Sequence, residues 1–288
     1  MRRTRRQPPR VRIITVSSKI DSPKSAQALT ETQVQHFIRD GFVEVEHAFS
    51  RELAEEVRAI FWEDLRAHGC LPGDPGTWTH PVIRLGMYTQ KPVVAAANTP
   101  LLHAAFDQLA GPACWRPCMS VGTLPVRFPS PNDPGDTGWH VDASFGYEEA
   151  DFMDWRVNIH SRGRALLMLF LFSDVGEQDA PTRIRAGSHR DIARALAPAG
   201  DSGLRLRDLI PHIAGTSDRP EVLATGHAGT VYLCHPFLVH SAQVHRGAEP
   251  RFLAQPPLLP STEHWIERLG QSAGPVARAI SLALEESA

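Results

Sequence analysis

The spacing of hydrophobic residues divides the chain into two parts. Up to about residue 119, apolar side chains recur every three to four positions, with Ser or Thr before such stretches and Gly after them, which is typical of amphipathic helices. Thr30 and Gln33 fit a capping box, and Gly41 follows the apolar positions of that segment. Helices are therefore expected at 30–41, 50–69 and 101–109.

From about residue 120, short runs rich in Val, Leu and Phe are separated by Pro, Gly, Asp and Asn. Many short strands without alternating helices predict an antiparallel sandwich or barrel rather than a parallel dinucleotide-binding sheet. Within this β region only one helix is expected, near 191–196, and a last amphipathic helix is expected at 274–286. The predicted strands are 121–128, 138–142, 164–173, 182–186, 229–235, 238–242 and 251–255.

Charge is unevenly distributed along the chain, although the net charge is only −2. Residues 1–28 are strongly basic and contain several prolines and few apolar residues, which predicts a disordered tail. No aromatic residue is interleaved with the arginines, so we expect no nucleic-acid partner. An export signal is not expected either, because no apolar stretch follows the paired arginines.

The remaining composition is that of a globular protein, 42% hydrophobic and 22% charged. The longest apolar run, 165–172, is far shorter than the roughly 20 residues of a membrane span, so no membrane association is expected. Cys114 and Cys118 lack a second pair that would complete a zinc site, and four cysteines in a chain of this length suggest reduced thiols in a cytoplasmic protein.

The clearest candidate for chemistry is the sequence Gly-Trp-His-Val-Asp at 138–142. In a strand, His140 and Asp142 would point to the same face about 6.6 Å apart, close enough to bind one ion. Two His and one carboxylate on one face of an octahedron are typical of non-haem Fe(II) oxygenases. A third ligand could come from a later strand, where the candidates are His235, His240 and His245.

Arg251 follows His240 by eleven residues, and an antiparallel return would bring it beside the metal, where a guanidinium can bind a dicarboxylate. This order of residues resembles the phytanoyl-CoA dioxygenase family of Fe(II)/2-oxoglutarate-dependent oxygenases. The resemblance covers most of residues 29–256 and includes the opening at 29–42, the segments 138–142, 186–189 and 229–240, and Arg251.

The resemblance implies a mainly β fold with flanking helices, built around a double-stranded β-helix (a jelly-roll, cupin-like core). We therefore expect one oxygenase domain at 29–288: a largely helical part at 29–119, the jelly-roll at 120–256 and a C-terminal helical segment at 257–288.

The resemblance also implies site residues. His140, Asp142 and His240 would bind Fe(II), and Arg251 would bind the C5 carboxylate of 2-oxoglutarate. Ala242 stands where the family often has a hydroxyl residue, and Leu167 and Met168 stand where relatives offer a polar side chain, so Arg127 is the candidate for a second 2-oxoglutarate anchor. His235 and His245 are then not expected to be ligands, and His189 is expected to be structural.

The expected function is oxidation by Fe(II), 2-oxoglutarate and O₂ of a small molecule, by hydroxylation of an unactivated C–H, in specialised metabolism. Desaturation, epoxidation or cyclisation would use the same iron site, whereas the carboxylate of Asp142 argues against halogenation. Two other classes remain: a non-catalytic jelly-roll binding protein, and a cupin-like enzyme independent of 2-oxoglutarate. The acidic, aromatic stretch 145–155 is compatible with a lid that favours a cationic substrate, or with a plain solvated loop.

Overall fold

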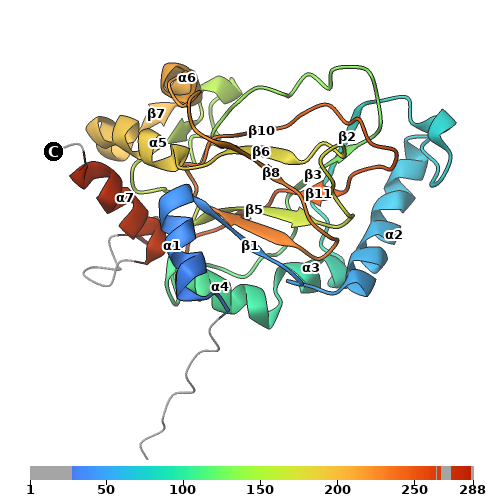
Figure 1. The fold of residues 1–288 in the computed structure, drawn as a ribbon, viewed down its shortest axis with the longest axis horizontal. Helices are drawn as coiled ribbons and strands as arrows, with labels where there is room; N and C mark the ends of the chain where they lie inside the picture. The colour runs from blue at the N-terminus through green and yellow to red at the C-terminus, as the bar shows by residue number, and fades with distance from the viewer. Residues whose placement is uncertain (1–27, 264, 267–273, 287–288) are drawn as a thin grey trace, which may run out of the picture.

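The computed structural model describes residues 28–263, 265–266 and 274–286. The predicted disordered tail therefore lies, apart from Ala28, outside the described residues. The described strands form two main antiparallel sheets, drawn one above the other in Figure 1, with helices packed around them. Among these residues the sheets do not close into a barrel.

The larger sheet has five strands, and it contains β5, the longest strand among the described residues that is buried at every position. Strand β9 pairs with β1 on one side and β5 on the other, and two short strands pair along the far edge of β5. The strands of this sheet are β1 (Phe42–Val45), β9 (Val231–Cys234), β5 (Leu166–Leu171), β11 (Leu253–Ala254) and β12 (Pro257–Leu258).

The smaller sheet has three strands, with β6 in the middle. Two separate ladders lie outside both sheets, one joining β2 to β3 and the other joining β4 to β7. The strands of the smaller sheet are β10 (His240–Ser241), β6 (Thr182–Arg185) and β8 (Glu221–Ala224). The strands of the ladders are β2 (Val82–Gly86), β3 (Thr123–Arg127), β4 (Arg156–Val157) and β7 (Leu204–Arg205).

Strand β5 is apolar at every position because both of its faces are covered. Leu167, Leu169 and Leu171 pack with residues of the smaller sheet, such as Ile184. The intervening side chains, such as Phe170, belong to the cluster that the N-terminal helices cover. Side chains alternate between the two faces of a strand, so a strand buried on both faces reads as the continuous apolar run seen at 165–172.

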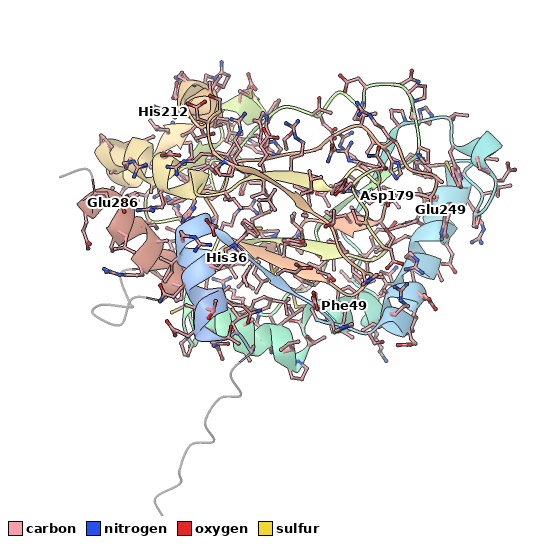
Figure 2. All side chains as sticks on the ribbon, in the orientation of Figure 1. His36, Phe49, Asp179, His212, Glu249 and Glu286 are labelled. Carbon is pink, nitrogen blue, oxygen red and sulfur yellow. The ribbon has the colours of Figure 1, made fainter. Side chains whose placement is uncertain are left out.

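Seven α-helices are found in the described residues. The capping box at Thr30 is present, and Gly41 ends the first helix in the left-handed conformation. Figure 2 shows Glu286 at the end of the last helix, where its carboxylate pairs with Arg190 and Arg194 of the neighbouring helix. The helices are α1 (Glu31–Asp40), α2 (Arg51–Ala67), α3 (Lys91–Ala97), α4 (Pro100–Ala110), α5 (Ser188–Leu196), α6 (Leu206–Ala214) and α7 (Pro275–Glu285). Three 3₁₀ turns are η1 (Pro75–Thr77), η2 (Phe152–Asp154) and η3 (Ala197–Ser202).

The predicted mainly β, cupin-like fold class is confirmed, but two local predictions are wrong. Residues 138–142 do not form a strand, because His140 makes only an isolated bridge to His240. A second helix, α6, lies inside the β region and buries Leu209 and Ile213, although Pro211 lies within it.

The composition led us to expect no membrane-spanning helix and reduced cysteine thiols. None of the helices in the described part of the chain combines the length and apolar character needed to cross a bilayer. All four cysteines lie among the described residues, and all four are buried thiols that form no disulfide.

A pair of buried histidines joins α5 to the end of β9. The His189 ring lies 4.8 Å from that of His235, and its Nε2 lies 3.2 Å from the carbonyl oxygen of Ile38, the geometry of an N–H donor. Burial lowers the pKa of His189 to about 4, so the ring is neutral in the folded protein at pH 7. His189 therefore has the structural position that the sequence predicts.

We expect metal-free protein to lose stability as the pH falls below about 6.5, because unfolded His189 takes up a proton that the folded ring refuses until about pH 4. His189 alone should lower the free energy of unfolding by about 2 kcal/mol between pH 7.5 and pH 5. Urea unfolding of the wild type and of His189→Gln at several pH values measures this. An identical pH dependence of the two proteins would contradict the assignment.

Candidate active site

Two histidines far apart in sequence are held face to face by the backbone. His140 and His240 exchange both backbone hydrogen bonds, N to O, of 2.9 and 3.0 Å. In antiparallel pairing, residues that exchange both bonds lie directly opposite each other with their side chains on the same face. Their ring centroids are accordingly 4.3 Å apart.

Asp142 completes the group on the same face of the backbone. Its Oδ1 lies 3.7 Å from Nε2 of His140 and 3.7 Å from Nε2 of His240. One ligand atom from each of the three residues lies within 4.8 Å of the others, so the group could hold a metal ion. The structure thus brings together the three residues predicted as metal ligands.

The hydrogen bonds of both rings leave the correct nitrogen available. Nδ1 of His140 lies 2.9 Å from the carbonyl oxygen of Gly138, and Nδ1 of His240 lies 3.0 Å from that of Leu238. A carbonyl oxygen only accepts, so Nδ1 carries the proton in each ring and Nε2 keeps its lone pair. Both lone pairs therefore lie on the Nε2 atoms nearest Asp142.

The charge states of the group also suit a cation. Burial raises the pKa of Asp142, but the nearby Arg164, His240 and His140 lower it by more. The net pKa therefore lies below the usual value for an aspartate. Burial, together with neighbouring His140, lowers the pKa of His240 to about 4. At neutral pH the site therefore offers an ionised carboxylate and a neutral His240 ring, which are the forms that bind metals.

Two arginines are paired beside this group in the same way as the histidines. Arg127, at the end of β3, exchanges backbone hydrogen bonds of 3.1 and 2.8 Å with Arg251. Their side chains therefore share a face, and both are almost fully buried. Arg127 donates to Asp136 over 2.7 Å, and Arg251 donates to the carbonyl oxygens of Ala180 and Pro125.

These arginines still have unused donors. Nε and Nη1 of Arg127 and Nε of Arg251 are buried without a hydrogen-bond partner among the described residues. Burial and the neighbouring Arg127 lower the pKa of Arg251 well below its usual value, an effect that Asp136 opposes. An arginine stays charged in a protein, so the shift indicates a site that lacks negative charge.

A cavity of about 230 Å³ joins the two groups. Its lining includes both histidines, both arginines and Asp136, together with Arg84, which also pairs with Asp136. One carboxylate thus faces three guanidiniums. The cavity has the charge and the free donors to bind a small anion next to the metal-binding group.

Other sequence candidates lie elsewhere. His235 is buried with its Nε2 3.3 Å from the Val276 carbonyl oxygen, and its Nδ1 accepts from the backbone of Phe237. Nδ1 of His245 accepts from the backbone of Gly247. Neither residue belongs to the metal-binding group, and His240 is the later histidine that joins it.

Two residues that the sequence did not single out are part of the site. Asp136 pairs with Arg127 across the cavity, and Arg164 contacts Asp142. No local pattern marks either one. Asp136 lies in a Pro- and Gly-rich loop, and Arg164 merely precedes an apolar strand. Only the fold shows that each has a charged partner.

The acidic stretch 145–155 forms ion pairs with two arginines at the start of α6. Arg207 pairs with Asp151 and Asp154 at 2.8 Å in each case, and Arg205 lies 3.5 Å from Asp154. Two of its acidic groups are thus compensated, which removes much of the basis for expecting a cationic substrate.

The fold and this arrangement define a class, that of non-haem oxygenases with a cupin-like core. The sequence model of the PhyH family, phytanoyl-CoA dioxygenase, matches residues 3–253. The chain belongs to this family, whose members are non-haem dioxygenases dependent on Fe(II) and 2-oxoglutarate, and the expected family, enzyme class and cofactors are confirmed. A search of curated proteins found no match.

Solved structures share the fold at low sequence identity. The carbocyclase SnoK of nogalamycin biosynthesis aligns with a TM-score of 0.53 and 18% identity over 83% of this chain and 87% of its own. The epimerase SnoN, in complex with Fe³⁺, α-ketoglutarate and nogalamycin RO, gives 0.53 and 20% over 78% and 81%. EctD from S. alaskensis, with 2-oxoglutarate and 5-hydroxyectoine, gives 0.50 and 21% over 79% and 75%.

The excess of guanidinium groups predicts that small dicarboxylates stabilise the metal-free protein. At ten times the dissociation constant, glutarate should raise the midpoint of thermal unfolding by about 3 °C. Arg251→Met should remove this stabilisation, because the buried guanidinium of Arg251 has an unpaired donor for the anion. The control Arg51→Met, a change at the surface, should leave the stabilisation intact. A shift that persists in Arg251→Met would contradict this assignment of the anion site.

Proposed function

We propose that this protein hydroxylates an unactivated C–H of a small molecule, using Fe(II), 2-oxoglutarate and O₂. His140, Asp142 and His240 bind the iron, Arg251 binds the far carboxylate of 2-oxoglutarate, and Arg127 is its second anchor. The observation that carries the proposal is the cavity that joins the two histidines of the His-Asp-His group to two buried arginines that have unpaired donors.

The donor set supports iron at this site. Two imidazole nitrogens and one carboxylate oxygen on one face are typical of non-haem Fe(II) oxygenases, which need open positions for cosubstrate and O₂. Each histidine is held by a hydrogen bond from Nδ1 to a backbone carbonyl, the usual support of a metal-binding ring.

The arginine pair supports 2-oxoglutarate as the anion. A dicarboxylate whose keto acid end binds the metal needs a cationic partner for its other end, and Arg251 offers the planar fork that matches a carboxylate. Arg127 lies opposite it on the same face, with Nε and Nη1 free. Asp136 holds Arg127 in place without neutralising both cations.

The chemistry supplied at this site by Fe(II) and 2-oxoglutarate is O₂ activation coupled to oxidative decarboxylation, which yields succinate, CO₂ and an oxidised substrate. The protein provides three fixed ligands, a cationic end for the cosubstrate and a partly enclosed cavity.

Hydroxylation is the simplest outcome of this site, and desaturation, epoxidation and cyclisation share it. The solved neighbours include a carbocyclase and an epimerase, so one fold serves several reactions. The carboxylate of Asp142 supports oxygenation rather than halogenation, because it fills the position that a halide would need. Product analysis by mass spectrometry separates the reactions: a gain of 16 mass units marks hydroxylation or epoxidation, and a loss of two marks desaturation or ring closure.

We further propose that residues 29–288 act as one cytoplasmic domain. One hydrophobic cluster contains Leu29 from the start of the domain, Phe170 from β5 and Val276 from α7. A shared core of this kind favours a single folding unit over separate domains. The buried thiols agree with a reducing compartment.

Anaerobic titration of Fe(II) with 2-oxoglutarate should produce a visible metal-to-ligand charge-transfer band, because the keto acid end binds the metal directly. Fe(II) alone should give no such band. Well-folded protein that binds iron without forming the band would favour a cupin-like enzyme independent of 2-oxoglutarate. Protein that binds neither would favour a jelly-roll binding protein.

Two substitutions separate the roles within the site. Asp142→Ala should abolish succinate formation, because it removes the only carboxylate of the metal-binding group. Arg251→Met should instead raise the 2-oxoglutarate concentration needed for half-maximal band intensity by about 10-fold to 100-fold, since a charged hydrogen bond contributes roughly 1.5–3 kcal/mol. Its affinity for Fe(II) alone should stay near that of the wild type. Full activity in Asp142→Ala would refute its role as a ligand.

A further inference from the structure

Arg164 lies on the far side of Asp142 from the two histidines. Its Nη1 is 3.4 Å from Oδ2 of Asp142, whereas Oδ1 of the same carboxylate faces His140 and His240. Its Nη2 donates a 3.1 Å hydrogen bond to the carbonyl oxygen of Ala143, the next residue. The residue is 7% exposed, so one guanidinium, largely shielded from water, contacts both the carboxylate and the backbone that follows it.

The position of Arg164 is fixed by the turn that precedes it. The Ser161 hydroxyl donates to the Arg164 carbonyl oxygen over 2.6 Å, and the Arg164 backbone N–H donates to the Ser161 carbonyl oxygen over 3.2 Å. The buried Trp265 indole also donates to that Ser161 oxygen, over 3.2 Å. The turn therefore has its own rigid support, independent of Asp142.

The same turn is pressed against the segment that carries Asp142. Gly163 has φ +86°, and a Cβ at this position would lie 2.0 Å from the carbonyl oxygen of Ser144. Only glycine permits both the positive φ and this close approach. The contact brings the rigid turn and the 142–144 segment together, which places the guanidinium against the carboxylate.

We infer that Arg164 is a positioning residue for iron binding: it engages Oδ2 of Asp142 so that Oδ1 alone is presented to the metal. This inference rests on the proposed function, in which Asp142 is a ligand. A carboxylate can bind a metal through one or both oxygens, and a charged donor on one oxygen favours binding through the other. Nε and Nη1 of Arg164 have no hydrogen-bond partner among the described residues, so both remain available to the Asp142 carboxylate.

A second effect of Arg164 acts in the opposite direction. A guanidinium close to a metal site repels a divalent cation, so its removal would strengthen metal binding if charge alone mattered. Orientation and repulsion therefore predict opposite signs for the same substitution. This makes metal affinity a decisive measurement.

The experiment compares Fe(II) affinity, measured by anaerobic titration without substrate, in the wild type and in Arg164→Met. Positioning predicts binding about 10-fold to 100-fold weaker. Arg164→Lys, which keeps the charge but loses the planar fork, should fall between the two. Unchanged or tighter binding in Arg164→Met would overturn the inference. The matched control is Arg162→Met, two residues away, whose guanidinium pairs with Glu263 at the surface.

A double-mutant cycle separates positioning from general support of the fold. In an Asp142→Ala background, adding Arg164→Met should not weaken Ni²⁺ binding, because Arg164 acts through the missing carboxylate and only its repulsion of the cation remains. Ni²⁺ is the probe because imidazole ligands retain affinity for it. Ni²⁺ affinity is measured in both backgrounds. If Arg164→Met weakens Ni²⁺ binding as much in the Asp142→Ala background as in the wild-type background, Arg164 only supports the fold and the inference is overturned.

The two proposals fail in different ways. If the wild type binds no Fe(II) and forms no band with 2-oxoglutarate, the proposed function fails. If the wild type does both and Arg164→Met does so equally well, only the role of Arg164 fails. Circular dichroism and thermal unfolding of each variant show whether it is folded, and Arg164→Lys provides the comparison if Arg164→Met is not.

Discussion

The site depends on two backbone hydrogen bonds between His140 and His240. These residues are 100 positions apart, and His140 lies in a segment without regular secondary structure. The double exchange of N–H and carbonyl groups turns both rings to one side. Each ring is then oriented by a carbonyl two residues before it in the chain. With both rings on one side, Oδ1 of Asp142 lies 3.7 Å from Nε2 of each.

The arginines repeat the same device at the other end of the cavity. Arg127, the last residue of β3, and Arg251 are also joined by a two-bond bridge, and they also project to one side. Isolated bridges of this kind give a side chain the precision of a strand while leaving the neighbouring chain free to turn. The loop after His140 uses that freedom to reach Asp142 and then Ser144, which the Gly163 turn contacts.

The sequence was sufficient for the fold class and for the residues that the site brings together, and the reason is chemical. Under the proposed roles, the metal ligands and the anion-binding arginine are polar residues next to apolar segments, so their order along the chain is informative. The fully apolar sequence of β5 likewise indicates a strand that is buried on both faces. The strand predicted at 138–142 was wrong because its alternation of residues comes from a metal site rather than from a sheet.

Partners that act only through space were not predictable. Asp136 and Arg164 lie in loops that carry no motif for a charged site, and their roles come from the charged side chains that they meet in the fold. Helix α6 was missed because Pro211 weakens its helical pattern. The acidic stretch 145–155 illustrates the same limit, because its charge was visible in the sequence but the compensating Arg205 and Arg207 could be matched to it only in three dimensions.

The charge of the cavity has a consequence for turnover. Under the proposed roles, Arg251 and Arg127 recognise the end of 2-oxoglutarate that the reaction does not alter. Succinate keeps that carboxylate, and it also keeps a second one where the keto acid was. With several guanidiniums around one aspartate, the cavity would then have an electrostatic reason to retain the coproduct, and product inhibition by succinate with a slow release step would follow from its charge balance.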